Sequence, residues 1–77
     1  MLGAELRKAR MAAGLTQEEV AHRAGMDRAY VSELEGDKKS PTVNRLFRLC
    51  EAIGVSPAKL IQRVEKALQK APRTRTR

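Results

Sequence analysis

Apolar residues recur along the chain at the three-to-four-residue spacing of amphipathic helices, and no alternating strand pattern interrupts them. Glycines, prolines and capping residues divide this pattern into five predicted helices. The first is predicted to run from about Leu2 to Ala13 and to stop at Gly14. Its inner stripe consists of Leu2, Leu6, Ala9, Arg10 and Ala13. An arginine thus shares the apolar side of this helix.

Two short helices follow, separated by only a few residues. The second is predicted to begin at Thr16, within the sequence TQEE. The Thr16 hydroxyl can cap the helix while the Glu19 side chain accepts a hydrogen bond from the backbone N–H of Thr16. Gly25 then supplies a left-handed turn, and Asp27 is expected to cap the third helix. The inward positions of the two helices are Val20, Ala21, Ala24, Val31 and Leu34.

The fourth and fifth helices have clear start signals. The stretch GDKKSPT is predicted to form a loop, after which Thr42 can cap a helix that Gly54 ends. The fifth helix is predicted over about 56–70, with Ser56 as cap and Pro57 at the first helical position. The apolar sets at helical spacing are Val43, Leu46, Phe47, Cys50 and Ile53, and then Leu60, Ile61, Val64 and Leu68. Pro72 separates this domain, residues 1–71, from a basic tail, 72–77, that we expect to be disordered.

The second and third helices together predict a helix-turn-helix over about residues 16–36. The helices of this motif cross closely, so a small residue such as Ala21 is needed where they touch. Gly25 reverses the chain without the steric penalty of a Cβ atom. The combination of Ala21, Gly25, Val31 and Leu34 with two capping residues is far more specific than an Ala-x-x-x-Gly spacing alone.

The charge of the chain favours a polyanionic partner. Sixteen Lys and Arg residues against nine Asp and Glu give a formal net charge of +7, of which Arg73, Arg75 and Arg77 in the tail supply +3. Such a domain is expected to bind nucleic acid before membrane. Because Tyr30 and Phe47 are the only aromatic residues, the stacking surfaces of single-strand binders are largely missing. Double-stranded DNA is therefore the expected partner.

The sequence indicates no other chemistry. Cys50 is the only cysteine and His22 the only histidine, so neither an intramolecular disulfide nor a Cys/His metal cluster is expected, and Cys50 is predicted to lie in the core. No carboxylate pair, nucleophile–base set or phosphate-binding glycine loop indicates an enzyme. No apolar run approaches the roughly 18 residues of a membrane span, and the first residues do not form a signal peptide. We therefore expect a cytoplasmic protein without cofactor, metal, membrane segment or small-molecule effector.

The segments LRKARMAAGLTQEEVAHRAGMDRAYVSELEG and SPTVNRLFRLCEAIGVSP resemble the Cro/phage-repressor type of helix-turn-helix regulators, over about residues 4–62. The resemblance implies an all-α, compact five-helix, lambda-repressor-like domain whose third helix enters the DNA major groove. It also implies two copies on two half-sites, and an ion pair between Arg10 and Glu35. One departure is Gly36, which follows the acid one place earlier than is usual in the family.

The outer face of the third helix holds the candidates for base contacts. With Val31 and Leu34 inward, this face presents Arg28, Ala29, Ser32 and Glu33. Arg28 can donate two hydrogen bonds to guanine O6 and N7, and the resemblance also places contacts of the third helix at this position. The alternatives are a phosphate contact and a solvated side chain. Ala29 either touches a thymine methyl or leaves room, and Ser32 can bond a base or a phosphate.

Glu33 is the unexpected member of this set, because DNA repels a carboxylate unless the carboxylate finds a donor such as cytosine N4. It either accepts a hydrogen bond from that amino group, orients Arg28 or another base-contacting group, or is simply exposed. The sequence leaves these three interpretations open.

Candidates for backbone contacts surround this face. Gln17 can donate its amide to a phosphate beside the positive end of the second helix. Tyr30, at the edge of the inner face, either packs locally or reaches a phosphate with its hydroxyl. The resemblance expects further backbone contacts around the loop into the fourth helix, from Lys38, Lys39, Ser40, Thr42, Asn44 and Arg45.

These patterns together predict a sequence-specific transcriptional regulator, such as a phage or plasmid repressor, that binds a palindromic operator as a homodimer. Leu60 and Ile61 are expected to seal the core, while Val64 and Leu68 extend the apolar stripe toward a partner copy or fold back on the first helix. The alternative function is a controller or antitoxin-like protein-interaction module of a phage, plasmid, restriction-modification or toxin-antitoxin system. The basic tail either lies along nucleic acid or is solvated.

Overall fold

The computed structural model of the chain describes residues 1–70, which form five α-helices and no strand. The helices are α1 (Leu2–Ala12), α2 (Gln17–Ala24), α3 (Arg28–Glu35), α4 (Val43–Ile53) and α5 (Pro57–Lys70). The predicted all-α, five-helix arrangement is thereby confirmed. None of the helices in the described range has the length and apolar character of a membrane span. The predicted basic tail, with Arg73, Arg75 and Arg77, lies outside the described residues.

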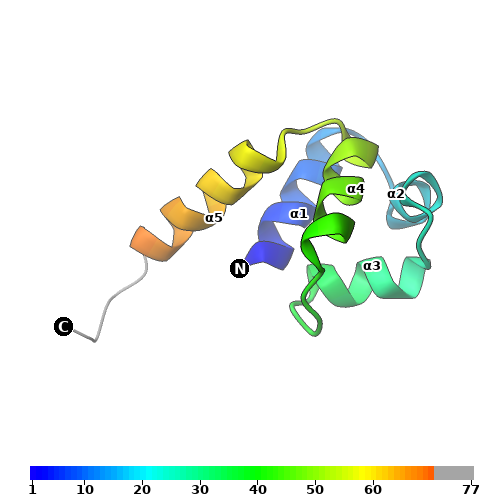
Figure 1. Cartoon of the computed structure of the whole chain (residues 1–77), viewed down its shortest axis with the longest axis horizontal. Helices are drawn as coiled ribbons and strands as arrows, with labels where there is room; N and C mark the ends of the chain where they lie inside the picture. Colours follow the sequence, from blue (N-terminus) through cyan, green and yellow to red (C-terminus); the bar gives the residue numbers. More distant parts are fainter. Residues whose placement is uncertain (71–77) are drawn as a thin grey trace.

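The helix-turn-helix and α5 lie at opposite ends of the domain. In Figure 1, α1 and α4 occupy the centre, α2 and α3 lie on one side, and α5 runs outward on the other. α2 packs against both α3 and α4, while α1 contacts α3 and α5. The two ends can therefore contact different partners at the same time.

Side-chain caps form at the starts of α2 and α4 as predicted. The Thr16 hydroxyl accepts a hydrogen bond from Glu19 N at 3.0 Å, and Thr16 N donates to the Glu19 carboxylate at 2.8 Å. The Thr42 hydroxyl accepts from Arg45 N at 3.2 Å. Asp27 differs from the prediction. It is the N-cap residue of α3, but its side chain makes no capping hydrogen bond within residues 1–70.

The capping box makes stability depend on pH through Glu19. The hydrogen bonds with the Thr16 backbone and then with its side chain lower the pKa of Glu19. Such a carboxylate stabilises the fold above its unfolded pKa of about 4.3, and this contribution is lost as the pH falls through the folded value. Between about pH 6 and about pH 3, we expect the Tm of the wild type to fall further than that of Glu19→Gln. Glutamine keeps an acceptor oxygen without titrating, so equal falls in circular-dichroism melts would contradict this.

The core lies where the first four helices meet, and the start of α5 closes it. Its buried apolar residues are Leu6, Ala9, Val20, Ala21, Ala24, Val31, Leu34, Leu46, Leu49, Cys50, Ile53 and Leu60. Burial raises the pKa of the Cys50 thiol, because a thiolate is disfavoured away from water. Cys50 is fully buried, which confirms it as the core residue that the sequence predicts.

The apolar sets predicted for α4 and α5 are partly wrong. Leu49, which the predicted set omitted, is 1% exposed, whereas Val43 and Phe47 are 70% and 56% exposed. Successive residues lie about 100° apart around a helix. Phe47, two positions before Leu49, therefore points away from the core. For the same reason Leu60 is buried, while the next residue, Ile61, is 47% exposed and does not seal the core.

The first turn of α1 approaches the end of α3 closely at Gly3. A Cβ atom at this position would lie 2.4 Å from the carbonyl oxygen of Leu34 and 2.5 Å from that of Glu35. Only glycine allows the two backbones to come so near. Gly3 N also donates a hydrogen bond to Asp37 Oδ1 at 2.9 Å. These contacts fix the end of α3 and the start of the next loop against α1.

The loop after α3 has its left-handed residue at Asp37 rather than at Gly36. The backbone φ angle is 57° at Asp37 and −88° at Gly36. Aspartate adopts the left-handed region more readily than most residues with a side chain. Lys38 N then donates to Glu33 O at 2.9 Å, which turns the loop back onto the last turn of α3. The loop lysines Lys38 and Lys39 consequently lie beside that helix.

Candidate nucleic-acid interface

An ion pair joins α1 to the C-terminal end of α3. Arg10 Nε lies 2.7 Å from Glu35 Oε2, and a second nitrogen of Arg10 donates to Glu35 Oε1 at 3.0 Å. The two side chains are only 12% and 6% exposed. Arg10 also donates to the Leu15 carbonyl oxygen at 2.8 Å. The hydrogen bonds that Arg10 donates to Glu35 raise the pKa of Arg10, despite partial burial that acts in the opposite direction.

Gln17 links this ion pair to the start of α3. Its amide nitrogen donates to Glu35 Oε1 at 3.0 Å. Its amide oxygen accepts from Arg28 at 3.4 Å. Because an amide nitrogen carries two hydrogens, one remains for a phosphate. Gln17 thus lies at the N-terminus of α2 where a backbone contact was predicted, and it also contacts the predicted base reader.

We call the exposed side of α3 the reading face; it comprises Arg28, Ala29, Ser32 and Glu33. The first three are exposed and Glu33 is half-buried, while Val31 and Leu34 on the opposite side are 3% and 1% exposed. The structure therefore brings the four predicted base readers to one surface of one helix.

Glu33 contacts the following loop rather than the start of α3. Its Oε1 lies 3.3 Å from Lys39 Nζ, in a partly exposed ion pair. Arg28 instead donates to Gln17, so the predicted option that Glu33 orients Arg28 corresponds to no contact within residues 1–70. The acid on the reading face is paired with a loop lysine.

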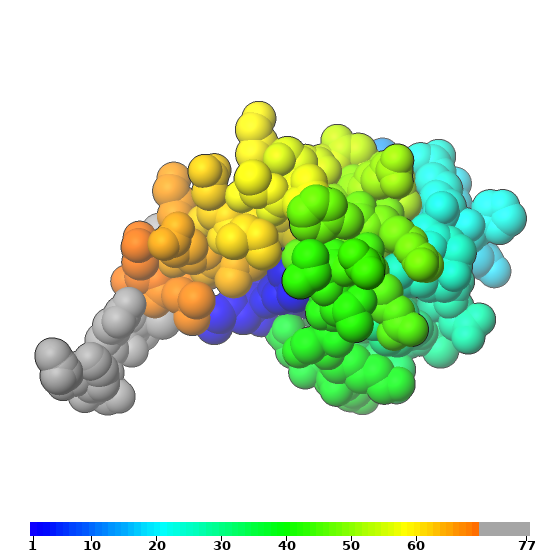
Figure 2. Space-filling model, in the orientation of Figure 1, coloured from blue at the N-terminus to red at the C-terminus, as the bar shows by residue number. Residues whose placement is uncertain are grey.

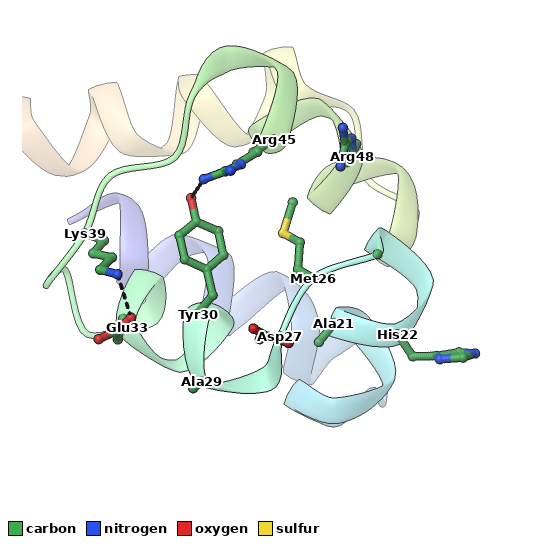
Figure 3. A pocket seen from close by; sticks show the side chains of 11 residues that line it. Ala21, His22, Met26, Asp27, Ala29, Tyr30, Glu33, Lys39, Arg45 and Arg48 are labelled. Atoms are coloured by element: carbon green, nitrogen blue, oxygen red, sulfur yellow. Dashed lines mark hydrogen bonds and ion pairs between the residues drawn. The ribbon is translucent and has the colours of Figure 1, made fainter.

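Tyr30 lies between two cationic side chains. Arg45 donates to the Tyr30 hydroxyl at 3.2 Å, and its guanidinium lies 5.1 Å from the ring centroid. Lys39 Nζ lies 5.8 Å from the same centroid. Figure 3 shows Tyr30 between Arg45 and Lys39, with Glu33 beside Lys39. Both distances are within the range of cation–π attraction, so the ring helps to hold both cations at the edge of the reading face.

Tyr30, Glu33, Lys39 and Arg45 line an open hollow of about 680 Å³ that is bordered by α2, α3, α4 and the turn before α3. Arg48 also lines it, one helical turn after Arg45. Arg48 was not among the predicted contact residues, although its three-residue spacing from Arg45 indicates that the two side chains share one face of α4. Around the loop, Lys38, Ser40, Thr42 and Asn44 are all exposed.

The predicted dimer residues lie on α5, away from the reading face. Val64 is half-buried and Leu68 is 45% exposed. In Figure 2, the yellow-to-orange surface of α5 projects from the body, and blue α1 is visible between it and green α4. The far half of α5 thus has an uncovered side within the described part of the chain.

Comparison with known proteins identifies helix-turn-helix relatives. A family model for helix-turn-helix domains matches residues 6–60. The chain is 41% identical over 61 residues to the uncharacterized HTH-type transcriptional regulator y4dJ of Sinorhizobium fredii, a match covering 79% of each protein.

Two solved structures share the arrangement of helices. The restriction-modification controller protein C.AhdI from Aeromonas hydrophila superposes with a TM-score of 0.74 and 34% identity, over 77% of this chain and 89% of that one. The clp gene regulator ClgR from C. glutamicum superposes with a TM-score of 0.81 and 35% identity, over 94% and 91% of the two chains. The chain therefore belongs to the Cro/phage-repressor type of helix-turn-helix proteins, a family of DNA-binding transcriptional regulators.

Proposed function

We propose that the protein is a sequence-specific transcriptional regulator that binds a palindromic operator in double-stranded DNA as a homodimer, with α3 in the major groove. The observation that supports this most directly is the reading face, bordered by the N-terminus of α2 on one side and by the basic loop on the other. In this proposal the protein acts in the cytoplasm by occupying DNA, not by catalysis.

The proposed base contacts come from Arg28, Ala29, Ser32 and Glu33. Arg28, exposed at the first position of α3, can present two donors to guanine O6 and N7. The Ala29 methyl group can pack against a thymine methyl, and the Ser32 hydroxyl can bond a base edge. The reading face thus offers both hydrogen-bonding and apolar discrimination.

The proposed phosphate contacts come from both sides of the reading face. Gln17 lies at the N-terminus of α2, where unpaired backbone N–H groups and the helix dipole favour an anion. The opposite side supplies Tyr30, Lys38, Lys39, Ser40, Thr42, Asn44 and Arg45. Contacts of this kind add affinity that is independent of sequence and that weakens as salt rises.

The proposed dimer surface is the uncovered apolar side of α5, with Val64 and Leu68. Ile61 and Leu68 are 47% and 45% exposed on this helix, and Phe47 of α4 is 56% exposed. Burying a fully exposed side chain of this size is favourable by about 1.5 to 3 kcal/mol, and covering the exposed part of each of these side chains would contribute a fraction of that value. A second copy packed here would leave both reading faces open, as binding to half-sites about 34 Å apart requires.

Replacing Leu68 with glutamate is expected to weaken the dimer at least about 100-fold, because the interface would have to bury an unpaired carboxylate. Analytical ultracentrifugation at micromolar concentration measures the change. The matched control is Met11→Glu, which places the same charge at a 57% exposed apolar position on α1. Dimer formation that survives Leu68→Glu, or a wild type that sediments as a monomer, would contradict the proposed surface.

Duplex binding tests the proposed function itself. In fluorescence-anisotropy titrations, the protein is expected to bind a duplex more tightly than either of its separated strands. Its affinity for the duplex should fall at least about 100-fold between about 50 mM and about 200 mM salt. Equal binding to single and double strands would contradict the proposal.

The likeness to C.AhdI supports a second, narrower candidate, in which the regulated genes are those of a restriction-modification system. The DNA-binding surfaces would be the same in both cases, and the candidates differ in where the operator lies. Mapping the DNA bound in cells separates them. An operator beside restriction and methyltransferase genes supports the narrower candidate, and operators confined to other genes exclude it.

A further inference from the structure

The acid of the reading face is held by a side chain from outside α3. Glu33 and Lys39 form an ion pair at 3.3 Å, with 41% and 56% of the side chains exposed. Both residues also line the hollow beside Tyr30 (Figure 3). The pair thus lies at the border between the proposed base-contacting and phosphate-contacting surfaces.

Lys39 is placed there by the fold of the loop. Lys38 N donates to Glu33 O at 2.9 Å, which ties the backbone next to Lys39 to the residue that it pairs with. The Tyr30 ring, 5.8 Å from Lys39 Nζ, attracts the ammonium from a second side. The Gly3 N hydrogen bond to Asp37 holds the start of the same loop against α1. The position of Lys39 is therefore set by backbone contacts as well as by charge.

Lys39 changes what Glu33 can do beside DNA. An unpaired carboxylate would be repelled by the phosphates of every duplex, whereas one paired with an ammonium has most of its charge compensated nearby. Lys39 contacts Oε1 of Glu33. Because a carboxylate accepts hydrogen bonds through both oxygens, Oε2 can accept one from a base amino group at the same time.

On these grounds, which rest on the proposed function, we propose that Lys39 is a specificity-determining positioning residue: it holds Glu33 so that the carboxylate accepts a hydrogen bond from the amino group of cytosine. Cytosine N4 is the donor of the major groove that suits a lone acceptor, since adenine N6 lies beside an acceptor atom that a carboxylate cannot satisfy. The ammonium group of Lys39 has three N–H donors, so Lys39 can also donate to a phosphate while it is paired with Glu33.

A double-mutant cycle tests this inference. The proteins are the wild type, Lys39→Met, Glu33→Gln and the double variant, with Lys38→Met as a control that removes the same charge from the same exposed loop. Methionine keeps the length of the lysine stem. Affinities are measured for an operator selected from random duplexes and for operators with single base pairs changed. The base pair that Glu33 contacts is identified as the operator position at which Glu33→Gln alters the base preference. Thermal melts of all variants check that the fold is intact.

We expect the wild type to prefer cytosine at that position by about tenfold. Lys39→Met should remove most of this preference and leave the base preferences at the other operator positions unchanged. Lys38→Met should instead lower the affinity for all duplexes equally. In the Glu33→Gln background, Lys39→Met should change no preference.

A uniform loss of affinity for Lys39→Met, with the preference intact, would show that Lys39 binds phosphate only. A Glu33→Gln protein with wild-type preferences at every position would also overturn the inference, while leaving sequence-specific binding established. A wild type without any sequence preference would overturn the proposed function along with it.

Discussion

Replacing Glu35 with alanine is expected to lower the free energy of unfolding by about 3 to 5 kcal/mol. The loss arises because Arg10, only 12% exposed, would keep its charge without the carboxylate that compensates it. Gln17 would lose its acceptor as well. Since small domains unfold with about 5 to 15 kcal/mol in total, this single change should remove a large part of the stability. Urea denaturation followed by circular dichroism measures it.

Glu33→Ala is the matched control for that experiment. Glu33 also lies in the second half of α3 and also pairs with a cation, but its pair with Lys39 is partly exposed. Exposed pairs contribute about 0 to 1 kcal/mol, so the stability of this variant should change little. Equal losses for the two variants would mean that burial of the Arg10–Glu35 pair has no special weight in the fold.

Replacing Arg28 with alanine is expected to weaken binding to the selected operator by about 10- to 100-fold, the range of one bidentate contact with guanine. Because Arg28 is exposed and its contact with Gln17 is long, at 3.4 Å, the stability should be unchanged. The loss should also be specific, since an operator with the contacted guanine replaced should bind the wild type and the variant almost equally. Anisotropy titrations with both operators measure this.

Arg23→Ala serves as the charge-matched control for Arg28. Arg23 is an exposed arginine near the end of α2, and it donates a long hydrogen bond to the Ala52 carbonyl oxygen at 3.4 Å. Its removal should affect all duplexes slightly and equally. If Arg28→Ala likewise weakens every duplex to the same extent, Arg28 contacts phosphate and not a base.

The helix boundaries could be predicted because they depend on local interactions. Thr16 and Glu19 cap α2 through a contact three residues apart, and Gly25 adopts a φ of 70° that the turn requires. Such effects are visible in a short stretch of sequence. The close approach at Gly3 is different, because it depends on the carbonyl oxygens of Leu34 and Glu35 far along the chain. Nothing near Gly3 in the sequence marks it as a contact with α3.

The sequence could not separate core positions from exposed apolar ones. Phe47 and Leu49 are both apolar and both lie in α4, but only Leu49 is buried. An apolar residue that contacts a partner chain produces the same sequence pattern as one that fills the core. The orientation of α4 against its neighbours decides between them, and this orientation is set by the packing of several helices together.

The reading face itself was predictable, because Val31 and Leu34 define the inner side of α3 and the remaining positions follow from helical geometry. The ion pair that Glu33 forms on that face could not be predicted in the same way. Whether Glu33 meets Arg28 or Lys39 depends on the path of the loop, which places its left-handed residue at Asp37. The arrangement of Arg45 and Lys39 around Tyr30 likewise depends on how α4 returns past α3.

Selection of binding sites from a random duplex library, at about 150 mM salt, tests the central claim most directly. A sequence-specific homodimeric regulator is predicted to enrich a single palindrome. Its half-sites should be centred about 34 Å apart, or a multiple of that distance, with a guanine in each that the Arg28→Ala protein no longer selects. Uniform, salt-sensitive binding with no enriched sequence would contradict the claim that α3 reads DNA.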